Sequence, residues 1–169
     1  MKIEELLEIE ELKRLRVAYT YYYDSRNLEG LVDLFTEDAV CDYGQYRGQW
    51  NGRKEIRENF KHFMDLSVAA DFDTMHIISN PLVTLLSSDT AHGRWYLTDC
   101  LTRQYPVTSL VTPGGHGNPL IWLGMYEDLY RKVGGIWKIE RTKNHFFWPA
   151  RDYSNSCIAS VGAEVGRKK

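Results

Sequence analysis

The chain has little cysteine or proline and no long apolar run. Its three cysteines (Cys41, Cys100 and Cys157) are widely spaced and lie outside any CxxC pattern, so we expect reduced thiols rather than a disulfide framework. No segment approaches the roughly 20 apolar residues that a transmembrane helix needs. The N-terminal segment is acidic, unlike a secretory signal. These absences predict a cytoplasmic protein that does not enter a membrane.

An excess of one charge sign is also missing. The net charge of -2 and the isoelectric point near 6.2 give no general attraction to nucleic acids or anionic membranes. The sequence contains no GxGxxG or P-loop motif, and no spacing typical of a zinc or non-haem iron site. We therefore expect no nucleic-acid partner, no metal and no cofactor.

Aromatic residues are plentiful. They make up 13% of the chain, including eleven tyrosines and five tryptophans, and such side chains can line a core, a pocket or an interface. The length of 169 residues suits one domain. We expect this domain to span residues 1–149 and to be followed by a C-terminal tail, residues 150–169. Aromatic residues on the predicted outer face of the sheet favour a homodimer or homotrimer.

The hydrophobic periodicity predicts helices first and strands later. Expected helices cover residues 3–23, 28–35 and 53–66, the last capped by Asn51. Residues 39–43 are strand-like and residues 44–52 are expected to form turns. Strands follow at 72–79, 82–87, 90–103, 119–132 and 135–146, with Gly134 and Gly135 as a hairpin turn and a long loop at 104–119. This α+β order predicts an antiparallel sheet that curls around the helices and leaves a cavity.

Asp99 occupies an unexpected position in this pattern. Trp95, Leu97, Asp99 and Leu101 alternate on one face of the predicted strand, whereas Arg94, Tyr96 and Thr98 occupy the other. A carboxylate on the apolar face must be hydrogen-bonded, paired or protonated, because desolvating an unpaired charge costs several kcal/mol. His76 and the end of the first helix, with Tyr19 and Asp24, are the candidate partners.

Each of these residues also has a structural interpretation. His76 alone would more often be a satisfied core or surface histidine, and Tyr19 could simply line the core. Asp24 lies in Asp-Ser-Arg-Asn, which suits a helix exit. Asp99 would be structural if it paired with Arg103 or Arg141. Four further residues are candidates for binding a substrate: Trp95, Tyr23, Arg141 and His145. The last two lie at even spacing from Trp137 and Ile139 on the last predicted strand, so they are expected to face the cavity as well.

Several segments together resemble the NTF2-like (SnoaL-like, cystatin-like cone) superfamily over about residues 5–147. They are the helix end YTYYYD, the segment NLEGLVDLFTEDAV, the helix GRKEIRENF and the hairpin YRKVGGIWKIER. The resemblance implies N-terminal helices packed in a strongly curved sheet. Because this frame is shared by enzymes and non-enzymes, it indicates the fold better than the function.

Within that superfamily, the chain most resembles the bacterial bile-acid 7α-dehydratases. The residues on which this resemblance rests are Tyr19 and Asp24 at the helix end, Met75-His76 in a strand, and GRWYL at 93–97 followed by Asp99. The resemblance implies functional roles for Tyr19, Asp24, His76 and Asp99. The Asp24 and His76 pair also resembles the dyad of scytalone dehydratase and hexachlorocyclohexane dehydrochlorinase. The loop 104–119 looks longer than in those dehydratases, so the resemblance does not identify the substrate.

The resulting hypothesis is a cofactor-independent lyase. His76 would take a carbon-bound proton, Asp24 would fix its tautomer, Tyr19 would donate to the departing hydroxyl or to an oxyanion, and Asp99 would orient Tyr19, hold substrate or share a proton. The expected substrate is a hydroxylated, largely apolar small molecule, such as a steroid or another polycycle. Alternatives are an isomerase or cyclase with the same residues, or a non-catalytic scaffold resembling the small subunit of ring-hydroxylating dioxygenases.

Overall fold

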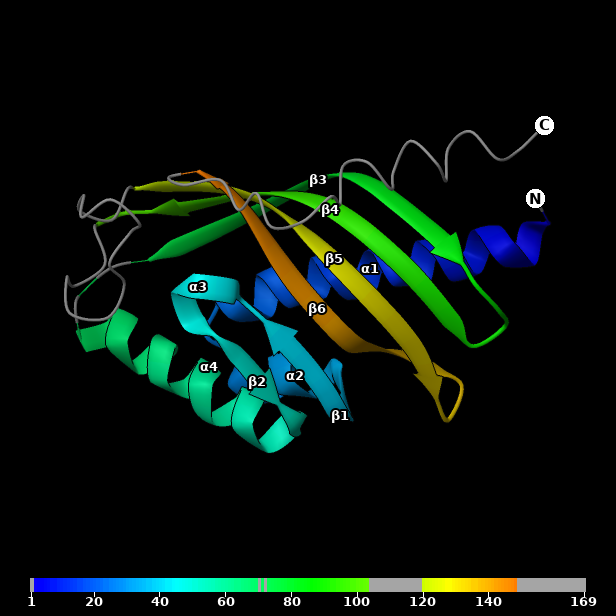
Figure 1. The fold of residues 1–169 in the computed structure, drawn as a ribbon, viewed down its shortest axis with the longest axis horizontal. Coiled ribbons are helices and arrows are strands. Elements are labelled where there is room, and N and C mark those ends of the chain that lie inside the picture. The colour runs from blue at the N-terminus through cyan, green and yellow to red at the C-terminus, as the bar shows by residue number, and fades with distance from the viewer. Residues whose placement is uncertain (1, 70, 72, 104–119, 149–169) are drawn as a thin grey trace.

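The computed structural model describes residues 2–69, 71, 73–103 and 120–148. It has the predicted α+β order, with helices first and most of the sheet after them (Figure 1). The elements are α1 (Ile3–Asp24), α2 (Leu28–Asp33), β1 (Phe35–Asp42), α3 (Gly44–Arg47), β2 (Gln49–Asn51), α4 (Gly52–Ala69), β3 (Thr74–Leu85), β4 (Thr90–Leu101), β5 (Ile121–Val133) and β6 (Ile136–Trp148). The loop 104–119, the tail 150–169, His116 and Cys157 lie outside the described residues.

The strands form one six-stranded sheet in the order β2-β1-β6-β5-β4-β3. β3 to β6 are joined as an antiparallel meander, whereas β1 pairs with β6 in parallel, which makes the sheet mixed. The long strands curve strongly, and α1 runs behind them as seen in Figure 1. The register of β3 and β4 sets His76 directly opposite Asp99. Side chains of directly opposed residues share a face and lie close together, so the sheet itself brings these two residues together.

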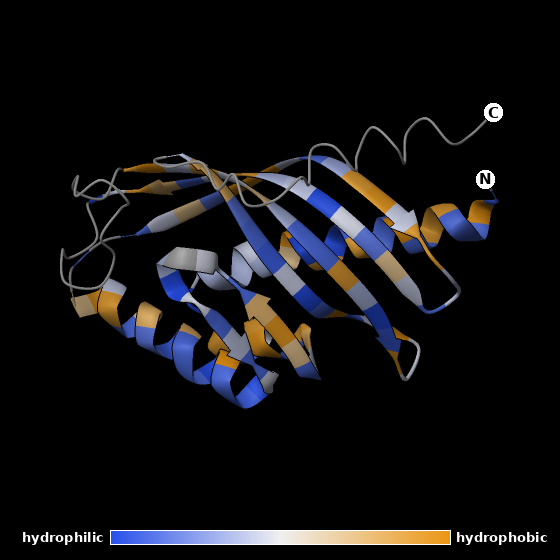
Figure 2. Ribbon diagram, in the orientation of Figure 1, coloured by the Kyte–Doolittle hydropathy of each residue, from blue (hydrophilic) through white to orange (hydrophobic). Residues whose placement is uncertain are grey.

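Apolar faces of α1 and α4 fill the concave side of the sheet. Leu12, Tyr19 and Tyr23 of α1 are buried, as are Ile56 and Phe60 of α4. Along the strands, hydrophobic and hydrophilic residues alternate in bands (Figure 2), as expected for a sheet with one face toward the core. The predicted core positions of α4, which also include Phe63 and Met64, are all buried. None of the helices in the described ranges has the length and apolar character to cross a membrane.

Several boundaries differ from the prediction. β1 begins at Phe35 rather than at residue 39, and the expected turns at 44–52 contain α3 and β2. The two strands predicted at 72–79 and 82–87 form a single strand, β3, because a register shift at Asn80, with φ of 51°, absorbs the Asn-Pro break. Asn51 does not cap α4: its side chain accepts a hydrogen bond from Gln49.

A bulge in β6 changes the prediction for two site candidates. Tyr130 pairs with Ile139, but Leu129 pairs with Arg141, so Glu140 is an extra residue in the ladder. Because side chains alternate with period 2, one extra residue moves every later side chain to the other face. Trp137 and Ile139 therefore face the core, whereas Arg141 and His145 face outward.

Candidate active site

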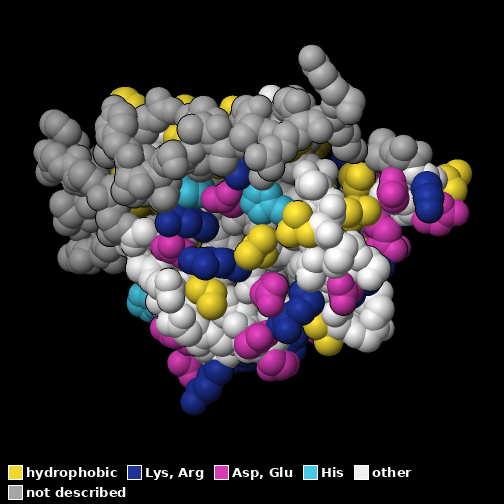
Figure 3. All heavy atoms as spheres, turned by 45° about the vertical axis from the view of Figure 1, so that its right-hand side comes forward, with side chains coloured by type: hydrophobic (Ala, Val, Ile, Leu, Met, Phe, Trp, Pro, Cys, Tyr) yellow, Lys and Arg dark blue, Asp and Glu magenta, His cyan; other side chains and the backbone are white. Residues whose placement is uncertain are grey.

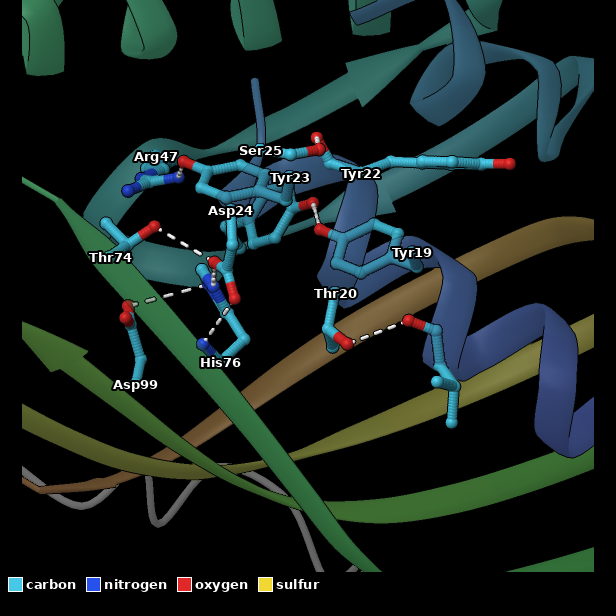
Figure 4. A network of polar contacts seen from close by, with 12 residues as sticks. Tyr19, Thr20, Tyr22, Tyr23, Asp24, Ser25, Arg47, Thr74, His76 and Asp99 are labelled. Atoms are coloured by element: carbon cyan, nitrogen blue, oxygen red, sulfur yellow. Dashed lines mark hydrogen bonds and ion pairs between the residues drawn. The ribbon is translucent and has the colours of Figure 1, made fainter. Parts of the chain in front are cut away.

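Asp24 and His76 form a hydrogen-bonded dyad. Asp24 Oδ1 lies 2.6 Å from His76 Nδ1, and Oδ2 accepts from the backbone N–H of His76 at 2.9 Å (Figure 4). The Thr74 hydroxyl also donates to Oδ1, at 3.0 Å. Asp24 is the last residue of α1, so its side chain can reach β3 beyond the helix end. The three contacts fix the carboxylate at the Nδ1 edge of the imidazole ring.

The second ring nitrogen is on the Asp99 side. His76 Nε2 lies 3.7 Å from Asp99 Oδ2, which is too long for a hydrogen bond but close enough for strong attraction. The side chains of His76, Asp24 and Asp99 are only 7%, 23% and 15% exposed, so both acids face the imidazole rather than bulk water. Asp99 Oδ1 has no hydrogen-bond partner within the described part of the chain. Nε2 is therefore the nitrogen left for chemistry.

The surroundings of His76 favour its charged form. Burial lowers the pKa of His76, but the negative charge of Asp99 and the hydrogen bond to Asp24 outweigh this effect and raise it above the ordinary 6.5. The positive charge of Arg47 opposes the increase. A raised pKa makes the imidazole a stronger base. The two acids that raise it also stabilise the imidazolium after a proton has been taken up.

Two buried tyrosines lie at another part of the same site. The hydroxyls of Tyr19 and Tyr43 are 3.0 Å apart. Burial raises the pKa of Tyr19, an effect that the charge of Arg16 only partly offsets, and burial raises the pKa of Tyr43 as well. Both phenols therefore keep their protons at neutral pH; one hydroxyl donates to the other, which leaves one O–H to donate to a bound oxygen.

A small cavity lies between the dyad and the tyrosines. The space open to the centre of a water-sized sphere is about 40 Å³, enough for a few water molecules. The described residues that line it come from α1, from α3 and the residue before it, and from strands β3 to β6: Tyr19, Tyr23, Tyr43, Tyr46, Arg47, His76, Leu97, Asp99, Trp122, Tyr126, Asn144 and Phe146.

The structure brings together five of the eight residues singled out from the sequence. His76, Tyr19, Asp99 and Tyr23 line the cavity, and Asp24 lies behind the imidazole, where it borders a second small hollow. Tyr23 contacts the imidazole edge-on, with ring centroids 4.7 Å apart. Asp99 pairs with neither Arg103 nor Arg141 and instead faces the imidazole, so the structural alternatives for it are wrong.

The other three residues lie elsewhere. Trp95 is buried on the concave face, but its indole N–H donates to the Tyr130 hydroxyl at 3.1 Å, away from the cavity lining. The expectation that Arg141 and His145 face the cavity is wrong, because the β6 bulge turns them outward. Arg141 is exposed, and His145 Nε2 lies 3.0 Å from Glu127 Oε2.

On that outer face, Glu127 lies between two histidines. Figure 3 shows a carboxylate flanked by two histidine side chains, with lysine and arginine side chains beside them. Hydrogen bonds to His145 and His92, with a further bond from Arg94, hold the pKa of Glu127 well below its usual range. Arg94, which the alternation places on the outer face, is therefore buried in an ion pair.

Sequence reasoning missed several cavity residues: Tyr43, Tyr46, Arg47, Trp122, Tyr126, Asn144 and Phe146. Trp122 and Tyr126 share the parity of the inward residues of β5, and this signal could have found them. Asn144 and Phe146 follow the bulge and have the parity opposite to Trp137, so the sequence pattern pointed away from them. Tyr46 and Arg47 were hidden in a segment that was expected to form turns.

Comparison with known proteins agrees with this architecture. The profile of the SnoaL-like domain matches residues 4–143. The chain belongs to the SnoaL-like family. The resemblance seen in the sequence, to the NTF2-like superfamily, is thereby confirmed.

Solved structures with a similar fold include proteins named as enzymes. A protein from Novosphingobium aromaticivorans assigned as a scytalone dehydratase is 24% identical, with a TM-score of 0.69 over 86% of this chain and 88% of that one. A second from that organism, assigned as an aromatic ring hydroxylase, is 25% identical, with a TM-score of 0.66 over 85% and 92%. A hexachlorocyclohexane dehydrochlorinase is 15% identical, with a TM-score of 0.66 over 86% and 89%.

These neighbours share a cystatin-like fold with this chain, and other proteins of that fold are of unknown function. Two of them, the scytalone dehydratase and the dehydrochlorinase, are named for elimination reactions.

Proposed function

We propose that this protein is a cofactor-independent dehydratase. The observation that carries the proposal is the position of the two ring nitrogens of His76. One is hydrogen-bonded to Asp24, and the other faces the cavity beside Asp99. A carboxylate on Nδ1 fixes the tautomer in which Nε2 is free to accept a proton. The family and the dehydratase and dehydrochlorinase neighbours support the same class of reaction.

The elimination begins when His76 Nε2 takes a proton from a substrate carbon. The electron pair of that C–H bond forms a C=C bond, and the C–O bond on the neighbouring carbon breaks. Tyr19 donates a hydrogen bond to the departing oxygen, and its raised pKa means that it polarises this oxygen without giving up its own proton. The imidazolium then delivers its proton to the leaving hydroxide, which produces water and restores neutral His76.

The two acids have different roles in this scheme. Asp24, which is itself held by the Thr74 hydroxyl and the His76 backbone N–H, orients the ring through its hydrogen bond to Nδ1 and stabilises the imidazolium as it forms. Asp99 stabilises the same cation by charge from the opposite edge of the ring. Its unpartnered oxygen is available to accept a hydrogen bond from a substrate hydroxyl.

The small volume of the cavity favours a compact, monocyclic substrate over the polycyclic one suggested by the resemblance. Assembly as a homodimer or homotrimer stays a prediction. Large apolar side chains exposed on the outer face of the sheet support it, among them Met75, Ile77, Tyr96 and Leu123.

The reaction class is tested by the mass of the product. With hydroxylated monocyclic compounds as substrates, we expect a product lighter by one water, because elimination removes a hydrogen and a hydroxyl from adjacent carbons. In deuterium oxide, the recovered substrate reports whether the carbon-bound proton exchanges. A product of unchanged mass would instead identify the isomerase or cyclase alternative, measured in the same mass-spectrometric assay.

The pH dependence of turnover tests the base. Because His76 must be neutral to accept a proton, we expect kcat/KM to rise with pH and to reach half its plateau above pH 6.5, the ordinary pKa of histidine. Asp99→Asn removes a negative charge that raises the pKa of His76. This variant should therefore shift the rising limb to lower pH, whatever its effect on the plateau. A limb that stays in place in Asp99→Asn would contradict the assignment of His76 as the titrating base.

A further inference from the structure

The cavity wall contains a positive charge that the proposed elimination does not use. Of the described residues that line the cavity, Arg47 is the one lysine or arginine. It is the last residue of α3, and its guanidinium carbon lies 4.0 Å from the centre of the Phe63 ring. Its Nη1 donates to the Tyr23 hydroxyl at 3.2 Å. These contacts hold the guanidinium in place against the aromatic wall.

Arg47 is coupled to the catalytic dyad through Tyr23. Figure 4 shows Arg47 at the Tyr23 hydroxyl, with the imidazole of His76 nearby. The charge of Arg47 is felt at the imidazole, where it lowers the pKa of His76. Because the Tyr23 oxygen accepts a hydrogen bond from Arg47, its own O–H remains available to donate to a ligand. A cation and a phenol donor therefore lie together beside the base.

Asp99 is the one carboxylate in the described lining of the cavity, and other groups there are donors that favour an electron-rich ligand. Trp122 is buried, and its indole N–H, which can only donate, has no partner in the described ranges. The phenols of Tyr19 and Tyr43 keep their protons because burial raises their pKa. Leaving a buried donor unpaired is unfavourable, and a ligand oxygen would remove that cost.

We propose that Arg47 is an anion subsite, and that the protein acts on carboxylate-bearing hydroxy compounds rather than on neutral hydroxylated hydrocarbons. The identification of the substrate class rests on the proposed dehydratase function. A planar guanidinium is well suited to a carboxylate, because it can donate two parallel hydrogen bonds to its two oxygens. Arg47 and Tyr23 hold the carboxylate, which leaves the hydroxyl-bearing part of the molecule to His76 and Tyr19. The limited space in the cavity agrees with a small acid anchored by its charge.

Binding of two matched probes tests this subsite without turnover. Benzoate and benzamide are nearly identical in shape and differ in charge, and their dissociation constants can be measured by calorimetry. The His76→Gln variant is used as the parent, since it removes the imidazolium as a competing cation. We expect this parent to bind benzoate at least roughly tenfold more tightly than benzamide, the scale of a charge-assisted hydrogen bond.

Adding Arg47→Gln should abolish the preference, whereas adding Arg47→Lys should keep part of it. The matched control is Arg141→Gln, which removes an exposed arginine on the outer face and should leave the preference unchanged. Circular dichroism and thermal unfolding establish that each variant is folded. Equal binding of the two probes to the parent, or a preference that survives Arg47→Gln in a folded protein, would overturn the proposal.

The outcome is separable from that of the proposed function. A carboxylate preference that depends on Arg47, with no dehydration of any hydroxy acid, would leave the anion subsite standing and the dehydratase proposal refuted. Dehydration of neutral substrates by a protein without that preference would support the dehydratase proposal and refute the anion subsite.

Discussion

Replacement of His76 by alanine is expected to remove turnover while leaving the protein folded. General acid–base catalysis typically contributes about 10²–10⁴ in rate, and His76 both accepts and returns the proton in the proposed reaction. The expected loss in kcat is therefore at the upper end of that range. Steady-state kinetics with the substrate found in the product assay measures it. The ring is surrounded by Asp24, Asp99 and Tyr23, so ligand binding should persist in the enlarged cavity.

Two further variants make the result specific. Asp24→Asn keeps the shape of the side chain but cannot hold the required tautomer, so it should also lower kcat by a large factor. His62→Ala is the matched control, because His62 lies exposed on α4 and should be neutral. If His76→Ala turned over as fast as the wild type, or if His62→Ala lost as much activity, the dyad would not be the catalytic centre.

Replacement of Arg16 by methionine is expected to cause the largest loss of stability. Arg16 and Asp128 form an ion pair with both side chains fully buried, at 3.6 Å from Nη1 to Oδ1. Burial lowers the pKa of Arg16, but the attraction of Asp128 outweighs it, so the pKa is raised and the arginine is charged. Breaking a buried pair by removing one partner costs about 3–5 kcal/mol, because a charge is left uncompensated. Urea denaturation measures the free energy of unfolding.

The surroundings of Asp128 set the size of this effect. The hydroxyls of Tyr130 and Thr142 each donate a hydrogen bond to Asp128 at 2.6 Å. Because these bonds remain after Arg16 is replaced, we expect a loss of stability near the lower end of that range. Arg16→Met combined with Asp128→Asn should be more stable than Arg16→Met alone, because the orphaned charge is gone. Arg57→Met, which breaks the exposed pair with Glu29, should change little. A single variant as stable as wild type would show that the buried pair is dispensable.

Arg16 also connects stability with the site. Its guanidinium carbon lies 4.1 Å from the ring centre of Tyr19 and 3.5 Å from that of Tyr126, and both tyrosines line the cavity. The sequence pattern contains no reason to bury Arg16, because this arginine ends a run of glutamates followed by basic residues that is typical of a solvated helix face. Only the fold places Asp128 and two tyrosine rings around it.

The sequence by itself determined the order of helices and strands, the core face of α4 and the alternation that puts Asp99 among apolar residues. These features are local, because hydrophobic periodicity and turn residues encode them within a few residues. The resemblance added the family and the four residues Tyr19, Asp24, His76 and Asp99. Tertiary structure decided their arrangement, since the pairing of β3 with β4 opposes His76 to Asp99 and the end of α1 delivers Asp24.

Tertiary structure alone also decided which other side chains enter the cavity. One extra residue in β6 reverses the parity of residues 141–146, which sends Arg141 and His145 outward and Asn144 inward. A bulge depends on pairing between strands, so the periodicity of a single strand does not contain it. In the same way, Arg47 reaches the cavity because α3 packs against β6, a long-range contact that no local pattern in residues 44–52 encodes.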